Sequence, residues 1–321
     1  MRGQLMRLFT PGQHEAILNS NPSDTVAAQA YTAVGGGRVI SPQNVTYWRK
    51  LFVDNTGNMA KTDRELKEGR KIAAPEPCKA DVRRDSPVYE RILHIPDQHA
   101  PYHHEDALRF LATVAAEYLP DLVVNAGDEL DFHAMSFHDS DPNLDSAGAE
   151  LEAGKSWLHK LEKMFPDMLI CDSNHGSMAF RRAKAHGLPV QLIKSYREVV
   201  FPQGNGQGWH WAESWRVRTA LGDVLFKHQA SGNILSDAAH NDCNLMVGHN
   251  HGNYSVEYTA SSSRLYWGAF GGCLIDKDSY AFAYGKHSLR KPVLGCTMIL
   301  NGRPTLIPML LNKEGRWNGS L

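Results

Sequence analysis

The stretch DLVVNAGDELDF, residues 121–132, decides the fold, because a short apolar run leads directly into a glycine and two acids. A run of about four to eight apolar residues bounded by turn residues is typical of a buried strand. Amphipathic helical patterns lie on either side of it, at 104–119 and 151–165. Another strand pattern, RILHIPD at 91–97, precedes the first helix, and MLICDSNH at 168–175 follows the second. This alternation predicts βαβ units and a parallel sheet.

Beyond residue 208 the pattern becomes rich in strands. WRVRTALGDVLFKH at 215–228 and VLGCTMILNGRPTLIPMLL at 293–311 both favour hairpins. In the second, Asn301 and Gly302 form a dipeptide that is common in two-residue hairpin turns. We therefore expect an α/β half that is followed by a β-rich one containing these two hairpins.

Composition places the chain of 321 residues among ordinary globular proteins, with 42% apolar and 21% charged residues. We find no apolar run of about 18 residues and no secretory signal pattern, so no membrane association is expected. The formal net charge of −1 offers no bulk attraction for nucleic acid or anionic lipid. Five widely spaced cysteines (78, 171, 243, 273 and 296) predict reduced, buried thiols and a cytoplasmic location.

Residues 1–54 are predicted to form a small helical unit. Helical patterns cover 13–20, 23–34 and 41–52, with GGG at 35–37 before the last, which starts with Ser41 and Pro42 as helix-start signals. Two short helices about a glycine turn resemble a helix-turn-helix. Residues 1–51 carry five Lys and Arg against two acids, a local charge of +3.

In a helix-turn-helix the second helix enters the major groove of DNA. Gln43, Asn44 and Thr46 would then face base edges, and Arg49 and Lys50 would lie near phosphates. The alternative is that the unit is a helical cap or an oligomerisation element. Polar residues 55–88 are predicted to be a linker, and 89–321 a second domain.

Polar residues of the same kinds follow each predicted strand in this second domain. They are Asp97 and His99, Asp128 and Asp131, Asn174 and His175, His228, and finally His249 and His251 in LMVGHNHGNY at 245–254. Carboxylate, imidazole and amide ligands suit divalent ions such as Mn, Fe and Zn. These candidate ligands are too many for one ion, but they suit two ions about 3.5–4 Å apart.

The order D-x-H, G-D-x-x-D, N-H, H and G-H-x-H resembles the signature of the calcineurin-like metallophosphoesterases. The resemblance covers residues 89–255. It implies a four-layer αββα sandwich with a two-metal site at the carboxyl ends of the strands. The stretches SNHGSMAFRRAKAHGLP (173–189) and KPVLGCTMILNGRPTLIPMLLNKEGRW (291–317) also resemble phosphoesterases encoded by tailed bacteriophages.

This resemblance implies a role for each matching residue. Asp97, His99 and His251 would hold the first ion, Asn174, His228 and His249 the second, and Asp128 would bridge the two. Mn would be the preferred metal, with Fe, Zn or Ni as alternatives. A hydroxide shared by the ions would attack phosphorus in line. His175 would contact the phosphate and serve the leaving oxygen, and Asp131 would orient His175 or a metal ligand.

Two residues depart from the family pattern, because Ser173 and Gly176 flank the Asn-His pair where a glycine and an acid are common.

Arg181 and Arg182 are candidates for phosphate contacts, or else belong to a solvated basic face. His133 and His138 are candidates for the lining of a substrate groove. His94, inside a predicted strand, is expected to be a packed core residue. Gly248 and Gly252 are expected to let the backbone approach the metals.

These residues predict the chemistry but leave the substrate open. The favoured hypothesis is a phosphodiesterase that acts on DNA and is guided by the N-terminal unit. The first alternative is a phosphomonoesterase acting on a phosphoprotein or nucleotide. The second is a DNA-binding protein whose metal site is only structural. A homo-oligomer is compatible with each of these hypotheses.

Overall fold

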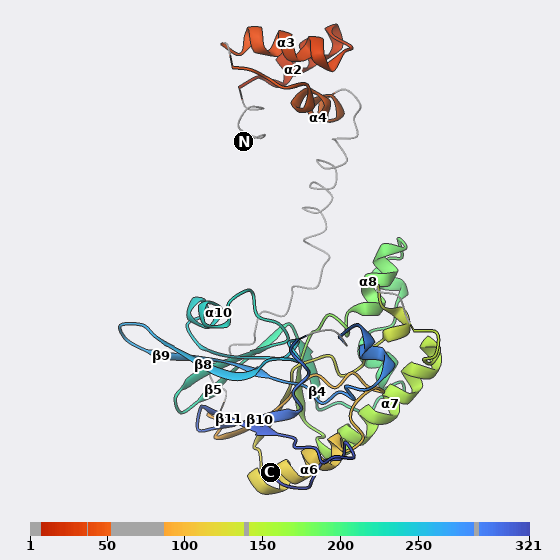
Figure 1. The fold of residues 1–321 in the computed structure, drawn as a ribbon, viewed down its shortest axis with the longest axis vertical. Helices are drawn as coiled ribbons and strands as arrows, with labels where there is room; N and C mark the ends of the chain where they lie inside the picture. Colours follow the sequence, from red (N-terminus) through yellow and green to blue (C-terminus); the bar gives the residue numbers. More distant parts are fainter. Residues whose placement is uncertain (1–7, 37, 53–86, 138–140, 286–288) are drawn as a thin grey trace. The chain divides into compact units, whose positions relative to one another are not determined.

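The computed structural model describes residues 8–36, 38–52, 87–137, 141–285 and 289–321 (Figure 1). The chain divides into two compact units, Met1–Glu76 and Pro77–Leu321. The predicted linker at 55–88 lies almost wholly outside the described residues, so the boundaries that we place around it remain predictions.

The first unit contains three described helices: α2 (Pro11–Ser20), α3 (Asp24–Val34) and α4 (Pro42–Phe52). Thr10 begins α2 with a capping box, since its side chain accepts a hydrogen bond from the Gln13 amide. Tyr31 and Trp48 are fully buried between the helices, with ring centroids 4.8 Å apart. The predicted helix pair is therefore part of a three-helix unit with its own aromatic core.

Arg49 joins these helices from the inside of the unit. Its guanidinium is bonded to the Asp24 carboxylate at 2.7 Å and to the carbonyls of Leu18 and Asn21 at 2.9 and 2.6 Å. Thr46 bonds the same carboxylate at 2.6 Å. Arg49 and Thr46 thus hold α4 against its neighbours, which corrects the expectation that they present free groups to DNA.

The second unit is built on two β-sheets. The six-stranded sheet has the order β11 (Arg303–Pro308), β10 (Gly295–Leu300), β1 (Arg91–Ile95), β2 (Leu122–Asn125), β3 (Met168–Cys171) and β4 (Trp209–Ala212). The five-stranded sheet has the order β5 (Ser214–Thr219), β6 (Gly222–Lys227), β7 (Asn244–Val247), β9 (Leu265–Gly271) and β8 (Tyr254–Ala260). β1 to β4 are parallel in the first sheet, and so are β6, β7 and β9 in the second.

Helices cover the outer faces of both sheets (Figure 1). The elements outside the sheets are α6 (Ala107–Tyr118), α7 (Ala147–Met164), α8 (Met178–Ala185), α9 (Tyr196–Val200), α10 (Ile234–His240) and the short η1 (His133–Met135), η2 (Val190–Leu192) and η3 (Tyr280–Gly285). Leucines of α6 and α7 share one core with the six-stranded sheet, and α10 shares another with β7 and β9. A third core lies between the sheets. The predicted four-layer αββα arrangement is confirmed.

Local sequence explains the two antiparallel hairpins. β5 pairs with β6, and β10 pairs with β11, as predicted from the alternating patterns. Asn301 and Gly302 connect the second pair with φ angles of 48° and 84°. Because both turn residues of the favoured two-residue hairpin need positive φ, the Asn-Gly dipeptide matches its position.

Two predictions about the chain as a whole can be compared with the described residues. Cys171, Cys243, Cys273 and Cys296 are buried free thiols, as expected, while Cys78 lies outside the described part. Among the helices that the structure describes, none combines the length and the apolar character needed to cross a bilayer.

His94 confirms its expected place in the core. It is fully buried between the sheets, and its ring stacks on Phe226 with centroids 5.9 Å apart. Within the described part of the chain, neither ring nitrogen has a hydrogen-bond partner. Burial lowers its pKa to about 4, although the charge of Asp97 acts in the opposite direction. The neutral imidazole is therefore the form that the fold accommodates.

We expect His94 to make the protein less stable in acid. Because its pKa falls from 6.5 in the unfolded chain to about 4 in the fold, the unfolded chain alone binds a proton between these values. The free energy of unfolding should fall by up to about 3 kcal/mol as the pH drops through this window. In urea unfolding, the free energy of unfolding of His94→Leu should lack this decrease with falling pH, whereas that of the exposed control His210→Gln should retain it. Identical pH profiles for His94→Leu and the wild type would contradict the prediction.

Candidate metal centre

The carboxyl ends of five parallel strands from the two sheets deliver the predicted ligands to one place. Residues 97–99, 128 and 174 follow β1, β2 and β3 of the six-stranded sheet. Residues 228 and 249–251 follow β6 and β7 of the other sheet. Neither sheet alone holds a full set, so the centre exists only where both sheets meet.

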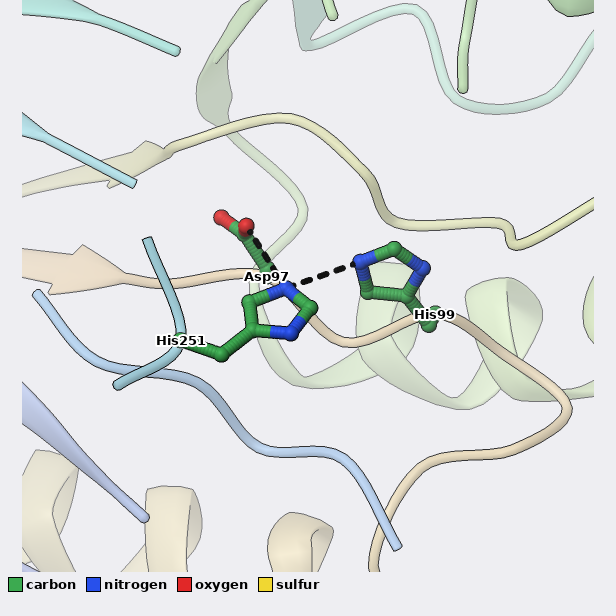
Figure 2. A group of neighbouring side chains, drawn as sticks. All are labelled: Asp97, His99 and His251. Carbon is green, nitrogen blue, oxygen red and sulfur yellow. Dashed lines mark hydrogen bonds and ion pairs between the residues drawn. The ribbon is translucent and has the colours of Figure 1, made fainter. Parts of the chain in front are cut away.

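The first group of donors consists of Asp97, His99 and His251 (Figure 2). The Nε2 atom of His251 lies 3.1 Å from Nε2 of His99 and 3.2 Å from Oδ2 of Asp97. These are the three residues predicted for the first ion.

The second group consists of Asn174, His228 and His249 together with Asp128. The Nε2 atom of His228 lies 2.6 Å from Oδ1 of Asn174 and 3.1 Å from Nδ1 of His249. Oδ2 of Asp128 is 3.3 Å from the same Nε2. These are the residues predicted for the second ion.

Asp128 connects the two groups. Its Oδ2 atom is 3.3 Å from Nε2 of His228 in the second group and 3.5 Å from Nε2 of His99 in the first. Its Oδ1 atom accepts a hydrogen bond from the amide of His175 at 3.1 Å. One carboxylate oxygen therefore faces both groups, as a bridging ligand must.

The donors fit divalent ions in spacing and in kind. Two ligands that each lie about 2.1 Å from one ion, at the usual coordination angles, are about 3.0–3.4 Å apart. The distances of 2.6–3.5 Å within each group bracket this value. In addition, Oδ1 of Asp97 is completely buried without a hydrogen-bond partner in the described structure. A buried carboxylate oxygen with no donor is well suited to a cation.

The backbone at three ligands adopts an uncommon conformation. His99, Asp128 and His249 have φ angles of 52°, 49° and 64°, in the left-handed region that side chains other than glycine seldom adopt. Such conformations cluster at functional sites. The turn after each strand thus points its ligand back toward the centre.

Only one of the two glycines predicted to admit the backbone lies against a ligand. A Cβ atom on Gly248 would lie 2.2 Å from Oδ1 of Asp97, so only glycine fits there. A Cβ on Gly252 would instead lie 3.0 Å from the side chain of Arg290. The expectation for Gly252 is therefore wrong, because its neighbour is the 290–291 segment.

Hydrogen bonds from outside the donor groups orient the ligand rings. Nδ1 of His99 bonds Oδ1 of Asp131 at 2.5 Å, and Nδ1 of His228 bonds the Ala126 carbonyl at 3.0 Å. Each bond leaves Nε2 as the atom that faces the centre, an arrangement common among metal-binding histidines. Asp131 therefore lies where the sequence analysis expected an orienting residue.

Ser173 is an organising residue that the sequence analysis did not identify. Its hydroxyl accepts hydrogen bonds from the amides of Asp128 and Gly176, both at 3.0 Å. It thus joins the loop after β3 to the loop that carries the bridging carboxylate. The departure from the family pattern at this position was the signal that pointed to it.

Charges within the centre compensate one another. Burial by itself would raise the pKa of Asp128, but the hydrogen bond and charge of His228 outweigh burial and hold that pKa well below its usual value. Burial would likewise lower the pKa of His228, yet Asp128 and Asp97 raise it to about 9. The protonated imidazole of His228 therefore supplies, in the protein alone, part of the positive charge that bound cations would supply.

His175 lies beside the first group and is partly exposed, at 21% of its side chain. Its Nδ1 atom donates to the backbone carbonyl of Asp131 and is 3.5 Å from Oδ1 of the same residue. Its ring is edge-on to His99 with centroids 4.5 Å apart. Because Nδ1 is engaged, the other ring nitrogen, Nε2, is the one that can contact a substrate.

The two predicted arginines differ in their contacts. Arg182 bonds the carbonyls of Met135 and Ser136, so it holds α8 to η1 and is not a free phosphate ligand. Arg181 is exposed, and its guanidinium approaches the carbonyl of the ligand residue Asn174 at 3.4 Å. Arg181 is therefore the more exposed of the two cations, and it lies at the loop that carries Asn174.

His133 is held beside Asp131 and not in an open groove. Its Nδ1 atom lies 3.8 Å from Oδ2 of Asp131, and Nε2 accepts the amide of Asp141 at 3.2 Å. His138 lies outside the described residues. A different aromatic residue, Phe282, packs edge-on against both His99 and His251, at 5.6 and 6.3 Å between ring centroids. The first group is thus walled by an apolar side chain.

Comparison with known proteins yields distant structural similarities only. No protein-family model and no curated protein matches the chain. A single-residue mutant of Vps29 from Entamoeba histolytica is 12% identical with a TM-score of 0.34, covering 69% of this chain and 99% of its own. Vps29 from Chaetomium thermophilum is 13% identical with a TM-score of 0.37, covering 72% and 94%.

The phosphoesterase YfcE from E. coli is 12% identical with a TM-score of 0.32, over 66% of this chain and 88% of its own. A functional proposal for this chain must therefore depend on its own side chains.

We expect His251→Ala and His249→Ala to weaken different ions. Loss of a residue that hydrogen-bonds a ligand typically weakens metal binding by roughly 10–100-fold, and loss of the ligand itself should weaken it more. In each variant, one of the two ions should therefore bind more than about 100-fold more weakly. Isothermal titration with Mn²⁺, with His210→Ala as the exposed control, measures both sites. Equal weakening of both ions, or of neither, would contradict the assignment.

Proposed function

We propose that this chain is a two-metal phosphoester hydrolase of the calcineurin-like superfamily. The observation that carries the proposal is the position of one Asp128 oxygen between two groups of donors, 3.5 and 3.3 Å from His99 and His228. A structural ion needs one closed set of four ligands, whereas paired sites that share a carboxylate are typical of phosphate-ester chemistry. This argues against the hypothesis of a purely structural metal.

The residues present divide the work of such a reaction. When bound, the two ions supply positive charge to the phosphate oxygens and increase the acidity of water. Asp131 holds His99 in the orientation that ligation needs. His175, fixed through Nδ1, offers Nε2 to the substrate, where it serves the leaving oxygen. Arg181 adds a positive charge at the exposed side of the Asn174 loop.

We propose Mn²⁺ as the metal, with Fe, Zn or Ni as alternatives, because the donors mix carboxylate, imidazole and amide groups. The bacteriophage origin, the cytoplasmic location and the homo-oligomeric state stay predictions from the sequence.

For the substrate, we propose DNA, hydrolysed as a phosphodiester and held by the N-terminal unit. The support is the local charge of +3 and the exposed or half-exposed Gln43, Asn44 and Lys50 on α4. Arg49 and Thr46 take no part, since they bond Asp24. A phosphomonoesterase acting on small substrates is the second candidate. A pocket of small-molecule size beside the second donor group favours it.

The hydrolase proposal predicts Mn²⁺-stimulated turnover of bis-p-nitrophenyl phosphate. His175→Ala should lower kcat by about 10²–10⁴-fold, because a positioned acid is lost. It should keep both ions, since His175 belongs to neither ligand set. The exposed control His186→Ala should behave as the wild type. Turnover of p-nitrophenyl phosphate alone would contradict the diesterase proposal, and turnover of neither ester would contradict hydrolysis.

The DNA proposal predicts that the N-terminal unit contributes to affinity. Removal of residues 1–54 should weaken duplex DNA binding and flatten its dependence on salt, because fewer counterions are released. In the full chain, Gln43→Ala with Asn44→Ala should reduce affinity, whereas Gln29→Ala on the exposed face of α3 should not. Fluorescence anisotropy at several salt concentrations measures both effects. An unchanged affinity after truncation would contradict a role of the N-terminal unit in DNA binding.

A further inference from the structure

A polar pocket adjoins the second donor group. Its volume is about 370 Å³, and its wall includes the two ligand residues Asn174 and His228. This volume is at the small end of sites that bind small molecules. By contrast, Phe282 packs against the ligands of the first group. The group that remains attached to the phosphate would therefore lie in the pocket on the side of the second ion.

Besides the candidate ligand His228, two acids and one lysine line the pocket. Lys227 is bonded to Asp237 at 2.9 Å and to Ser231 at 3.0 Å, so its charge is already compensated. Asp172 and Glu213 line the same pocket, and among the described residues neither carboxylate forms an ion pair. Cys171 of β3 is in register with Ala212 of the parallel neighbour β4, so the residues that follow them, Asp172 and Glu213, lie side by side at the ends of these strands.

The uncharged part of the lining favours hydroxyl groups over flat rings. Three serines and the amide residues Asn174, Gln229 and Asn241 are among the lining residues, and Leu225 is the one large apolar residue there. No Phe, Tyr or Trp is among the described residues that line it, so stacking of a nucleobase has no platform. Carboxylates accept hydrogen bonds only, and an acidic side chain is a common partner of sugar hydroxyls in nucleotide sites.

We propose that this pocket binds the hydroxyl-rich, uncharged part of a small phosphoester, such as a sugar or another polyol, and that Glu213 selects against anionic groups there. The proposal rests on the proposed hydrolase activity and deepens it. It concerns the small-substrate candidate, whose phosphate would lie at the metal centre with the rest of the molecule in the pocket.

Glucose 6-phosphate and 6-phosphogluconate form a matched pair of probes, because both carry hydroxyls and only the second has a carboxylate. With Mn²⁺ at low ionic strength, wild-type kcat/KM for glucose 6-phosphate should exceed that for 6-phosphogluconate by about two- to fivefold, since like charges repel but do so weakly where the side chain is exposed, as Glu213 is. Glu213→Gln should reduce this ratio, and Glu213→Lys should invert it. Glu257, exposed on β8, supplies the controls Glu257→Gln and Glu257→Lys, which should keep the wild-type ratio.

The outcomes separate this proposal from the hydrolase proposal. If the wild type hydrolyses p-nitrophenyl phosphate but shows the same ratio in every Glu213 variant, the pocket proposal is overturned and the hydrolase proposal stands. If the wild type hydrolyses none of the three esters, both proposals fail. Metal content measured by mass spectrometry must remain two ions per chain in the Glu213 variants, since Glu213 is not a ligand. A variant that loses an ion would contradict the placement of Glu213 outside the ligand sets.

Discussion

Two carboxylates, Asp97 and Asp128, are buried where the two β-sheets meet, and the arrangement around them follows from that burial. A carboxylate removed from water costs several kcal/mol unless positive charge and hydrogen bonds replace the water. Here the replacements are the imidazoles of His99, His228 and His251 and the backbone amides of His175 and His249. The histidines and amides that surround these carboxylates therefore also offset the free-energy cost of burying them.

The site couples the two halves of the domain, because neither sheet carries enough ligands alone. Asp97 from the first sheet accepts the amide of His249 from the second at 2.7 Å, and Gly248 has no side chain to separate them. Packing between the sheets, with His94 on Phe226 close behind the centre, sets this approach. Since the ligand set forms only when both sheets are packed, metal binding should contribute to folding.

The two halves of the centre differ in their surroundings. Phe282 closes the first half with an apolar ring, and the second half adjoins a pocket lined by polar groups. His175 and Arg181 lie on the partly exposed side, near the loop of Asn174. Two groups with similar donors therefore differ in what surrounds them.

Much of this protein could be predicted from local patterns. The strands, the amphipathic helices and the Asn301–Gly302 turn follow from residue types and spacing, because strand ends and turns have local signatures. The same patterns predict Asp, Asn and His side chains at the strand ends, and the family resemblance assigns seven of them to two candidate metal groups. Contacts between distant segments could not be predicted in this way. Arg49 and Arg182 look like free cations in the sequence, yet carbonyls far along the chain bind them. The roles of Ser173 and Phe282, and the pocket containing Glu213, likewise depend on which side chains meet across the two sheets and their loops. Periodicity specifies which face of an element is buried, but only tertiary packing decides which partner it meets there.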